Sequence, residues 1–112
     1  MLIYKIFRPE EWQILVDHGQ TQGAPIDVTD GYIHFSTYDQ VRETAAKHFA
    51  NAGDLILVAC DSDAMKPDMK WEVSRGGALF PHLYRVMRME DVIWHKPQPQ
   101  RDAGHIFPVD MS

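Results

Sequence analysis

The most informative stretch of this chain lies at residues 30–37 and reads Asp30-Gly31-Tyr32-Ile33-His34-Phe35-Ser36-Thr37. An aromatic and β-branched run with a histidine inside it is typical of a short strand, here over residues 32–35. Two hydroxyls end the run, and the spacing from Thr37 to Gln40 is that of a capping box, which starts a helix. A strand that delivers polar groups to a helix N-terminus is suited to bind an anion. We therefore expect a small polar site here.

Strand and helix patterns alternate on both sides of this stretch and predict an α+β fold with two N-terminal helices and a small mixed sheet. Residues 20–31 contain glycines, a proline and several polar residues, which indicates a loop. The apolar run 55–60 is typical of a strand covered on both faces. The expected helices run from Pro9 to Gly19 and from Thr37 to about residue 51, and the other expected strands cover 2–7, 70–74, 83–89 and 92–94.

Length and charge limit the class of protein. The chain has 112 residues, of which 45% are hydrophobic, and this suits one domain with a real core. We place that domain at residues 1–95 and an irregular, Pro-containing tail at 96–112. The net charge of -5 argues against a general nucleic-acid binder. No apolar run approaches the ~20 residues of a membrane span and the first residues lack a signal-peptide pattern, so we expect a soluble cytoplasmic protein.

His34 is the first candidate for chemistry. Its side chain points away from those of Ile33 and Phe35, either toward a ligand, as a hydrogen-bond donor or general base, or into the core against a backbone carbonyl. Ser36 and Thr37 add donors beside the helix N-terminus and favour the role toward a ligand. Thr37 is also the expected helix cap.

A second group of candidates lies late in the chain. Glu72 lies between two apolar residues and faces either solvent or a pocket, where it would hold a substrate hydroxyl or act as a base. His82 and Tyr84 share a face of an extended run and would pack against an aromatic or sugar ring, while Arg85 would bind a phosphate. The alternative for all of these side chains is a structural role.

Other chemistries are disfavoured. Cys60 lies inside an apolar run and is predicted to be a buried structural thiol rather than a nucleophile. His34, Glu72 and His82 are residue types that suit zinc, but no His-x-His or His-x-x-x-His spacing accompanies them, so we expect no metal site. A nucleophile elbow, a P-loop and a Gly-x-Gly-x-x-Gly motif are absent from the sequence.

A set of motifs spread over most of the chain has a recognisable order. In sequence they are Ile3-Tyr4-Lys5-Ile6, Trp12, the stretch 30–37, Gln40, Thr44-Ala45, Phe49, Leu55, Trp71-Glu72 and Phe80-Pro81-His82-Leu83-Tyr84. Together they resemble the small bacterial family known as domain of unknown function 952, over nearly the whole chain through Val92.

That family is similar in fold to ADP-ribosyltransferases and RNA 2′-phosphotransferases, which bind NAD or an ADP-ribosylated intermediate in a cleft between two small sheets. The resemblance implies an ADP-ribosyltransferase-like split sheet, with NAD or ADP-ribose as candidate cofactor. The pattern of those enzymes has an early-strand histidine, an aromatic residue on a strand leading into a helix, and often a late glutamate. By order along the chain, Lys5, His34 and Glu72 fall at these positions. In the alternative alignment, His34 is itself the early histidine.

Two functions stay open. In the first, the catalytic residues Glu72 and His34 belong to a pocket for a nucleotide or phosphosugar-like molecule, and the protein is a divergent transferase or hydrolase related to ADP-ribose and NAD. The ligand-binding residues of that pocket are Lys5, Ser36, Thr37, His82, Tyr84 and Arg85. In the second, the same residues are structural in a noncatalytic interaction or ligand-sensing module. Convergence of His34, Glu72 and His82 on one concave pocket favours the first.

Overall fold

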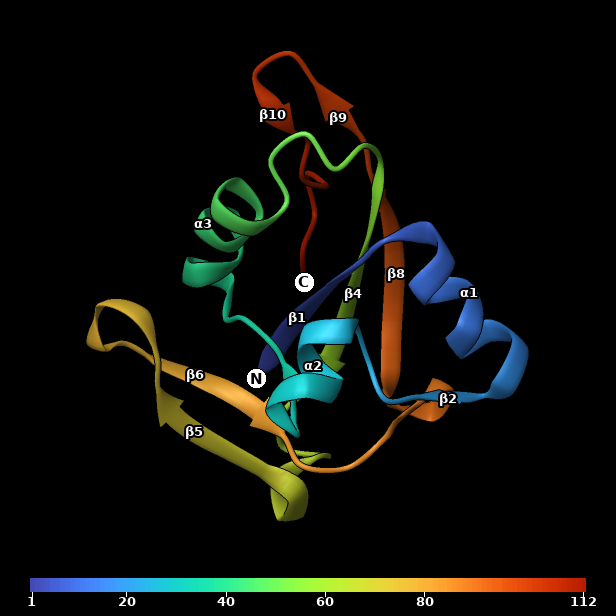
Figure 1. Cartoon of the computed structure of the whole chain (residues 1–112), viewed down its shortest axis with the longest axis vertical. Helices are drawn as coiled ribbons and strands as arrows, with labels where there is room; N and C mark the ends of the chain where they lie inside the picture. The colour runs from blue at the N-terminus through green and yellow to red at the C-terminus, as the bar shows by residue number, and fades with distance from the viewer.

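An antiparallel sheet of three strands forms the centre of the molecule, with β4 between β1 and β8 (Figure 1). The computed structural model describes residues 1–112, except for the side chain of Arg75. The helices are α1 (Pro9–His18), α2 (Pro25–Asp30) and α3 (Tyr38–His48), with 3₁₀ turns η1 (Lys66–Asp68), η2 (Arg75–Gly77) and η3 (Met89–Asp91). The strands are β1 (Leu2–Phe7), β2 (Gln20–Thr21), β3 (Ile33–His34), β4 (Leu55–Asp61), β5 (Met69–Val73), β6 (Leu79–Leu83), β7 (Met87–Arg88), β8 (Val92–Gln98), β9 (Gln100–Arg101) and β10 (Gly104–His105).

The two faces of the central sheet carry separate cores. Because side chains alternate along a strand, β1 sends Ile3 and Phe7 to one face and Tyr4 and Ile6 to the other. Helix α1 and the second sheet contribute to the first core, and α3 contributes to the second. The central strand β4 is buried on both faces, which confirms the prediction from its continuous apolar run.

A second sheet, in the order β3-β6-β5, lies beside the first. Its β5–β6 hairpin turns at Gly76-Gly77 and projects from the body of the molecule in Figure 1. An isolated bridge joins the two sheets, since the backbones of Tyr4 and Ser36 exchange hydrogen bonds of 2.8 and 2.9 Å. Every strand pair among the described residues is antiparallel, so the expectation of a mixed sheet was wrong.

Helix α2 lies in the segment expected to be a loop, so the prediction of two N-terminal helices missed one. Pro25 supplies the first helical position, and the backbone N–H of Ala24 donates to Asp27 Oδ2 at 2.7 Å. Gly31, at φ 85°, ends the helix in the left-handed conformation. A helix of this length is too short to show apolar periodicity, which is why the pattern indicated a loop. No helix among the described residues combines the length and apolarity needed to cross a bilayer.

The late strands also differ from the expected ones. The strand expected over 83–89 breaks after Leu83, where the backbone N–H of Tyr84 donates to the carbonyl of Asp68 at 2.8 Å, outside the β5–β6 ladder. The chain resumes pairing only at β7, which pairs with β2.

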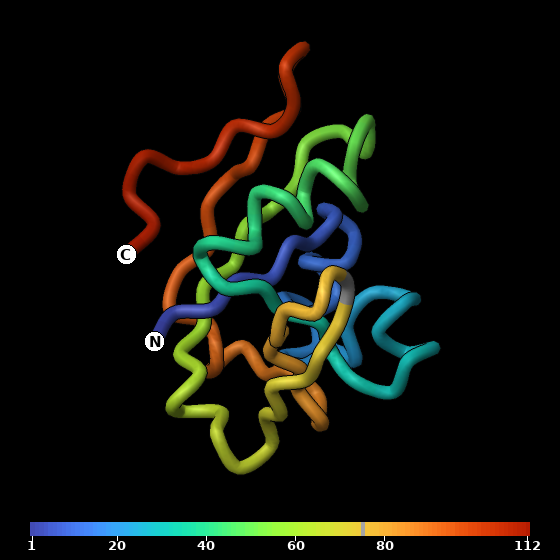
Figure 2. Tube along the Cα trace, turned by 90° about the vertical axis from the view of Figure 1, so that its left-hand side faces the viewer, coloured from blue at the N-terminus to red at the C-terminus, as the bar shows by residue number. Residues whose placement is uncertain are grey.

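The C-terminal segment contains more regular structure than an irregular tail. Strand β8 runs to Gln98, past residue 95, and Pro97 is tolerated because β8 is an edge strand. The chain then turns through β9 and β10 and runs back beside β8 (Figure 2). There Met111 is buried in the second core, and Tyr4 donates its hydroxyl hydrogen to the Met111 carbonyl at 2.5 Å.

Gln98 provides a stability prediction. Its amide is fully buried, and neither its oxygen nor its nitrogen has a hydrogen-bond partner among the described residues. Because an unpaired buried amide costs desolvation energy, Gln98→Leu is expected to raise the free energy of unfolding by about 1–2 kcal/mol. Thermal and urea unfolding measure the change, with the exposed Gln22→Leu as control. A destabilised Gln98→Leu would show that the amide is satisfied in solution, for example by an internal water.

Candidate functional site

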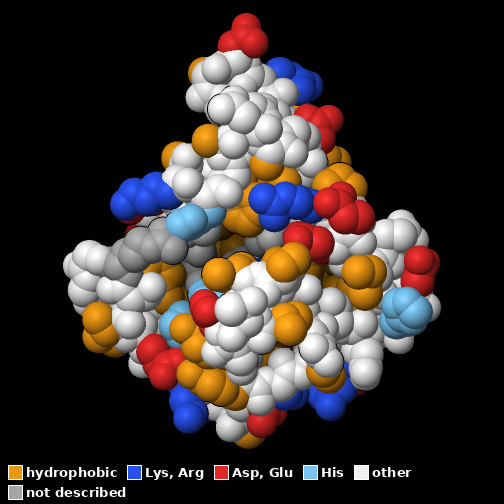
Figure 3. All heavy atoms as spheres, viewed as in Figure 1, with side chains coloured by type: hydrophobic (Ala, Val, Ile, Leu, Met, Phe, Trp, Pro, Cys, Tyr) orange, Lys and Arg blue, Asp and Glu red, His pale blue; other side chains and the backbone are white. Residues whose placement is uncertain are grey.

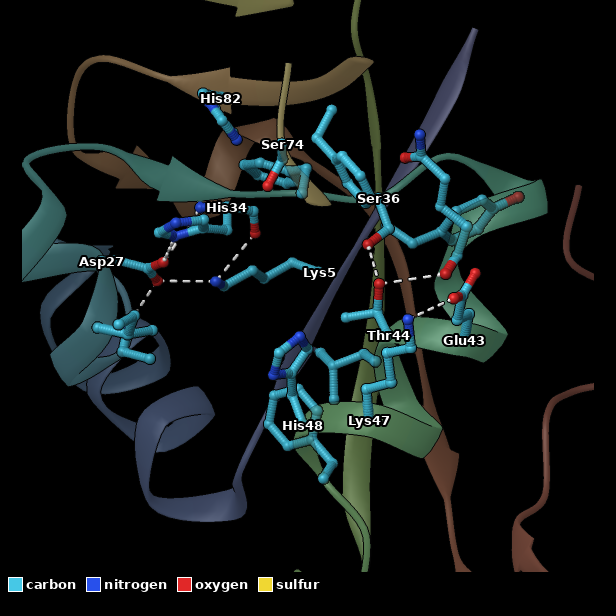
Figure 4. Close-up of a pocket in the computed structure, with 18 of the residues that line it drawn as sticks. Lys5, Asp27, His34, Ser36, Glu43, Thr44, Lys47, His48, Ser74 and His82 are labelled. Carbon is cyan, nitrogen blue, oxygen red and sulfur yellow. Dashed lines mark hydrogen bonds and ion pairs between the residues drawn. The ribbon is translucent and has the colours of Figure 1, made fainter. Parts of the chain in front are cut away.

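A cavity of about 690 Å³ lies where the two sheets meet, lined by residues of β1, α2, β3, α3 and β6. Figure 3 shows the surface hollowed between the β5–β6 hairpin and α2, with histidine side chains in and around the hollow. Figure 4 shows the polar side chains of its wall, which come from segments far apart in the sequence. The volume lies within the range of small-molecule sites, about 300–1,000 Å³.

The structure brings some of the predicted site residues together here. Those that line the cavity are Lys5, His34, Ser36 and His82. The others are not among the described residues that line it, and they are Thr37, Glu72, Tyr84 and Arg85.

A buried carboxylate that sequence reasoning missed, Asp27, joins two of these residues. Lys5 Nζ donates to Asp27 Oδ2 at 2.7 Å, and His34 Nδ1 lies 2.5 Å from Asp27 Oδ1. The backbone N–H of His34 adds a third contact at 3.1 Å. The Asp27 side chain is 0% exposed and that of Lys5 is 6% exposed. Burial acts to raise the pKa of the Asp27 carboxyl, but hydrogen bonds from His34 and the charge of Lys5 outweigh it and lower the pKa.

The lowered pKa of Asp27 predicts a pH dependence of stability. As the pH falls, the unfolded chain binds a proton at Asp27 near the ordinary pKa of 3.8. The folded protein keeps this carboxyl ionised down to a lower pH. Asp27 therefore stabilises the fold above pH 3.8, and this contribution is lost as the pH falls through the lower folded pKa. Urea unfolding at a series of pH values is expected to show a steeper acid loss for the wild type than for Asp27→Asn. Parallel curves for the two proteins would contradict the assignment.

His34 lies between two carboxylates. Its Nε2 is 3.0 Å from Asp30 Oδ2, while its Nδ1 faces Asp27. Because an ionised carboxylate only accepts hydrogen bonds, Nδ1 carries a hydrogen, and the contact with Asp30 is a hydrogen bond when Nε2 carries one too. The ring is thus held in a fixed orientation, with about a third of the side chain exposed.

Lys5 keeps one donor for the cavity. Its Nζ donates to Asp27 and to the backbone carbonyl of His34, at 2.7 and 3.0 Å. An ammonium group has three hydrogens. The third has no hydrogen-bond acceptor among the described residues, and Lys5 lines the cavity.

Ser36 is oriented by a short relay of hydroxyls. Thr44 donates its only hydroxyl hydrogen to the Gln40 carbonyl at 3.1 Å. The 3.0 Å contact between Ser36 Oγ and Thr44 Oγ1 is therefore donated by Ser36. Ser36 is left with oxygen lone pairs, so it is an acceptor toward the cavity.

His82 is held by Glu72 from outside the cavity. His82 Nδ1 lies 2.9 Å from Glu72 Oε1, which also accepts from the Tyr84 hydroxyl at 2.5 Å. Tyr32 stacks on His82 with ring centroids 4.2 Å apart. Hydrogen bonds from Tyr84 and His82 lower the pKa of Glu72, and the bond to Glu72 raises the pKa of Tyr84 to about 12.

Thr37 and Arg85 make contacts elsewhere. The backbone N–H of Thr37 donates to Gln40 Oε1 at 3.0 Å at the start of α3, the contact that the capping-box pattern indicated. The Arg85 guanidinium binds both carboxylate oxygens of Asp91 at 2.9 Å and reaches Asp68 at 3.1 Å. Among the described residues, no group of three or more His, Cys, Asp or Glu side chains is placed to hold a metal ion.

Cys60 is buried at the first core, and burial raises the pKa of its thiol to about 12. Since the thiolate is the reactive form, the folded protein is expected to resist a disulfide reagent such as Ellman's reagent in mildly alkaline buffer. The denatured chain is expected to react fully. Absorbance of the released thiolate measures both, and rapid reaction of the folded protein would contradict the burial of Cys60.

Comparisons with known proteins place these features in a family context. A family model described as protein of unknown function (DUF952) matches residues 6–95. The crystal structure of protein CC0527 from Caulobacter crescentus is 40% identical, with a TM-score of 0.89 over 94% of this chain and 92% of that one. The solution NMR structure of the same protein is 40% identical, with a TM-score of 0.82 over 93% and 90% of the two chains. No curated protein matches the chain.

Proposed function

The chain belongs to the DUF952 family of proteins of unknown function, and we propose that it binds a small polar ligand, a nucleotide or a phosphosugar, in the cavity between its sheets. The observation that carries the proposal is the buried network of Lys5, Asp27 and His34 in the cavity wall. The family resemblance read from the sequence is confirmed by the family model.

The energetics of the network support a ligand site. Burying a lysine and an aspartate costs several kcal/mol of desolvation per ion, and apolar residues of similar size often stabilise a fold as well or better. A fold gains little from such a pair at this position unless its charges also serve another purpose. Here Lys5 and His34 both line the cavity, where a bound molecule would contact them.

The donors and acceptors of the wall suit a particular class of ligand. Lys5 has an N–H to offer, which suits an anionic oxygen such as that of a phosphate. Ser36 offers only lone pairs, which suits a hydroxyl or amine hydrogen of the ligand. An anionic group and a hydroxyl within one molecule are the features of a nucleotide or phosphosugar.

NAD and ADP-ribose are the first ligands to test. They follow from the proposed similarity of this family to ADP-ribosyltransferases, whose cleft also lies between two small sheets. In the finer form of the proposal, the protein is a divergent transferase or hydrolase that acts on such a nucleotide.

Isothermal titration calorimetry tests the proposal with NAD, ADP-ribose, AMP and ribose 5-phosphate. Lys5→Met and His34→Ala are expected to weaken binding about 10- to 100-fold, the usual effect of losing a hydrogen bond to a charged group. His18→Ala, at the far end of α1 and outside the cavity lining, serves as matched control. If none of the ligands binds, or if the variants bind as well as the wild type, the noncatalytic interaction module is the better account.

A further inference from the structure

Two histidines face the cavity from directly opposed strand positions. The register of β3 and β6 sets His34 opposite His82, which places both side chains on one face of the second sheet. Their ring centroids are 5.3 Å apart, and both rings line the cavity. Figure 4 shows the His82 ring pointing from β6 toward His34.

A carboxylate holds the same nitrogen of each ring. Asp27 lies 2.5 Å from Nδ1 of His34, and Glu72 lies 2.9 Å from Nδ1 of His82. Because a carboxylate only accepts, Nδ1 carries the hydrogen in both rings. The nitrogen left for chemistry in His82 is therefore Nε2, which orients this ring for general acid–base catalysis. In His34, Nε2 also contacts a carboxylate, that of Asp30.

The surroundings of the two Nε2 atoms differ. His34 Nε2 lies 3.0 Å from Asp30 Oδ2, so a carboxylate favours a hydrogen on this nitrogen. His82 Nε2 has no hydrogen-bond partner among the described residues, although its side chain is only 4% exposed. In a neutral ring whose Nδ1 carries the hydrogen, an unpartnered Nε2 presents a lone pair that can accept a proton. The geometry thus gives one ring suited to donate a proton and one suited to accept it.

We propose that, at the ligand site of the proposed function on which this inference rests, His82 and His34 hydrolyse a small cyclic phosphate diester, of the class of 2′,3′-cyclic nucleotides. His82 Nε2 removes a proton from water as the water oxygen bonds to phosphorus. The bond from phosphorus to one ribose oxygen breaks, and His34 Nε2–H turns from the partly exposed Asp30 carboxylate to protonate the departing oxygen. The product is a nucleoside monophosphate with a free hydroxyl. The proton gained by His82 and that lost by His34 then exchange with solvent.

The arrangement of carboxylates favours P–O chemistry over reaction at the ribose carbon. Stabilising a cationic sugar carbon requires a carboxylate free to face it. Glu72 is not among the described residues lining the cavity and is bonded to His82 and Tyr84. The carboxylates that do line the cavity are each paired, Asp27 with Lys5 and His34, Asp30 with His34, and Glu43 with Lys47. Two oriented imidazoles, with the spare N–H of Lys5 for a nonbridging phosphate oxygen, suit an in-line displacement at phosphorus instead.

The substrate is small rather than polymeric. The net charge of -5 disfavours binding along a polyanionic nucleic acid. A cavity of about 690 Å³ has the size of a site for a single nucleotide-sized molecule.

The test is hydrolysis of 2′,3′-cyclic AMP, followed by ³¹P NMR and by chromatography of the products. We expect turnover with a bell-shaped dependence on pH, because one histidine must be protonated and the other neutral. His82→Ala is expected to lower kcat about 100-fold or more, and added imidazole is expected to restore part of it. His18→Ala is expected to match the wild type.

Glu72 is inferred to be a positioning residue, which a second variant tests. Glu72→Gln is expected to lower kcat about tenfold with KM unchanged, since it alters the orientation of His82 and not a contact with substrate. If Glu72 has a purely structural role, Glu72→Gln would instead lower the melting temperature and leave the kcat of the folded fraction unchanged.

Calorimetry with 3′-AMP separates this inference from the proposed function. Binding of 3′-AMP without hydrolysis of the cyclic nucleotide overturns the acid–base pair and leaves the ligand site standing. Absence of hydrolysis, together with absence of binding by 3′-AMP and by the four ligands tested for the proposed function, overturns both proposals. If circular dichroism shows that His82→Ala does not fold, the wild-type protein still tests the inference. A wild-type pH–rate profile that is not bell-shaped overturns it.

Discussion

Replacing Asp27 with alanine is expected to lower the free energy of unfolding by about 3–5 kcal/mol, the usual cost of breaking a buried ion pair by removing one partner. The substitution leaves the Lys5 ammonium buried with only the His34 carbonyl as acceptor among its described partners. It also removes the acceptor for the backbone N–H groups of Ala24 and His34. Urea unfolding followed by tryptophan fluorescence measures the loss.

Lys5, the partner of Asp27 in the buried ion pair, gives the matched comparison. Lys5→Met removes the charge but leaves Asp27 with hydrogen bonds from Ala24 and His34, so it is expected to cost about 1.5–3 kcal/mol. Asp17→Ala, on the exposed surface of α1, is expected to change stability by less than about 0.5 kcal/mol. Equal losses for Asp27→Ala and Lys5→Met would show that the ion pair alone, and not the backbone contacts of Asp27, matters for stability.

The central role of Asp27 shows where sequence reasoning ends. Its capping position could have been read from the spacing of Ala24, Pro25 and Asp27, a local signal that the loop-like composition of residues 20–31 outweighed. Its partner Lys5 is 22 positions away, and nothing in the local pattern indicates that the two meet. Contacts of this kind depend on how sheets and helices pack, which propensity and periodicity do not encode.

The same limit applies to the paired histidines. Alternation along the chain predicted that His34 would point away from its apolar neighbours, and the structure places it in the cavity wall. The register that sets it opposite His82 belongs to the pairing of two strands about fifty residues apart. Glu72 was selected because it interrupts an apolar run, yet its contact is with His82 and Tyr84 rather than with the cavity. Sequence thus identified the residue types and local faces, and long-range packing decided which of them share a site.

Removing the C-terminal segment from Phe107 onward is expected to lower the free energy of unfolding by about 3 kcal/mol or more, within the range for losing a large buried side chain and its contacts. Met111 packs in the second core beside Tyr4, Val41 and Leu57, and its carbonyl accepts the Tyr4 hydroxyl hydrogen. Without the segment, this hydroxyl and the apolar surface of the second core become exposed to solvent. A proline-containing tail gives no periodic pattern from which this packing could be predicted.

Point variants test whether the side-chain packing of residues 107–112 stabilises the domain. Met111→Ala is expected to lose about 2–4 kcal/mol because its side chain leaves a cavity next to β1 and β4. Val109→Ala, whose side chain is fully exposed two residues earlier, is expected to leave stability unchanged. Thermal unfolding of these proteins beside the truncated chain measures the difference. If Met111→Ala and the truncated chain unfold at the wild-type temperature, residues 107–112 are an appendage to the domain, as the composition of the tail indicated. If both unfold earlier, the second core needs its last residues, and the domain extends past the boundary at residue 95.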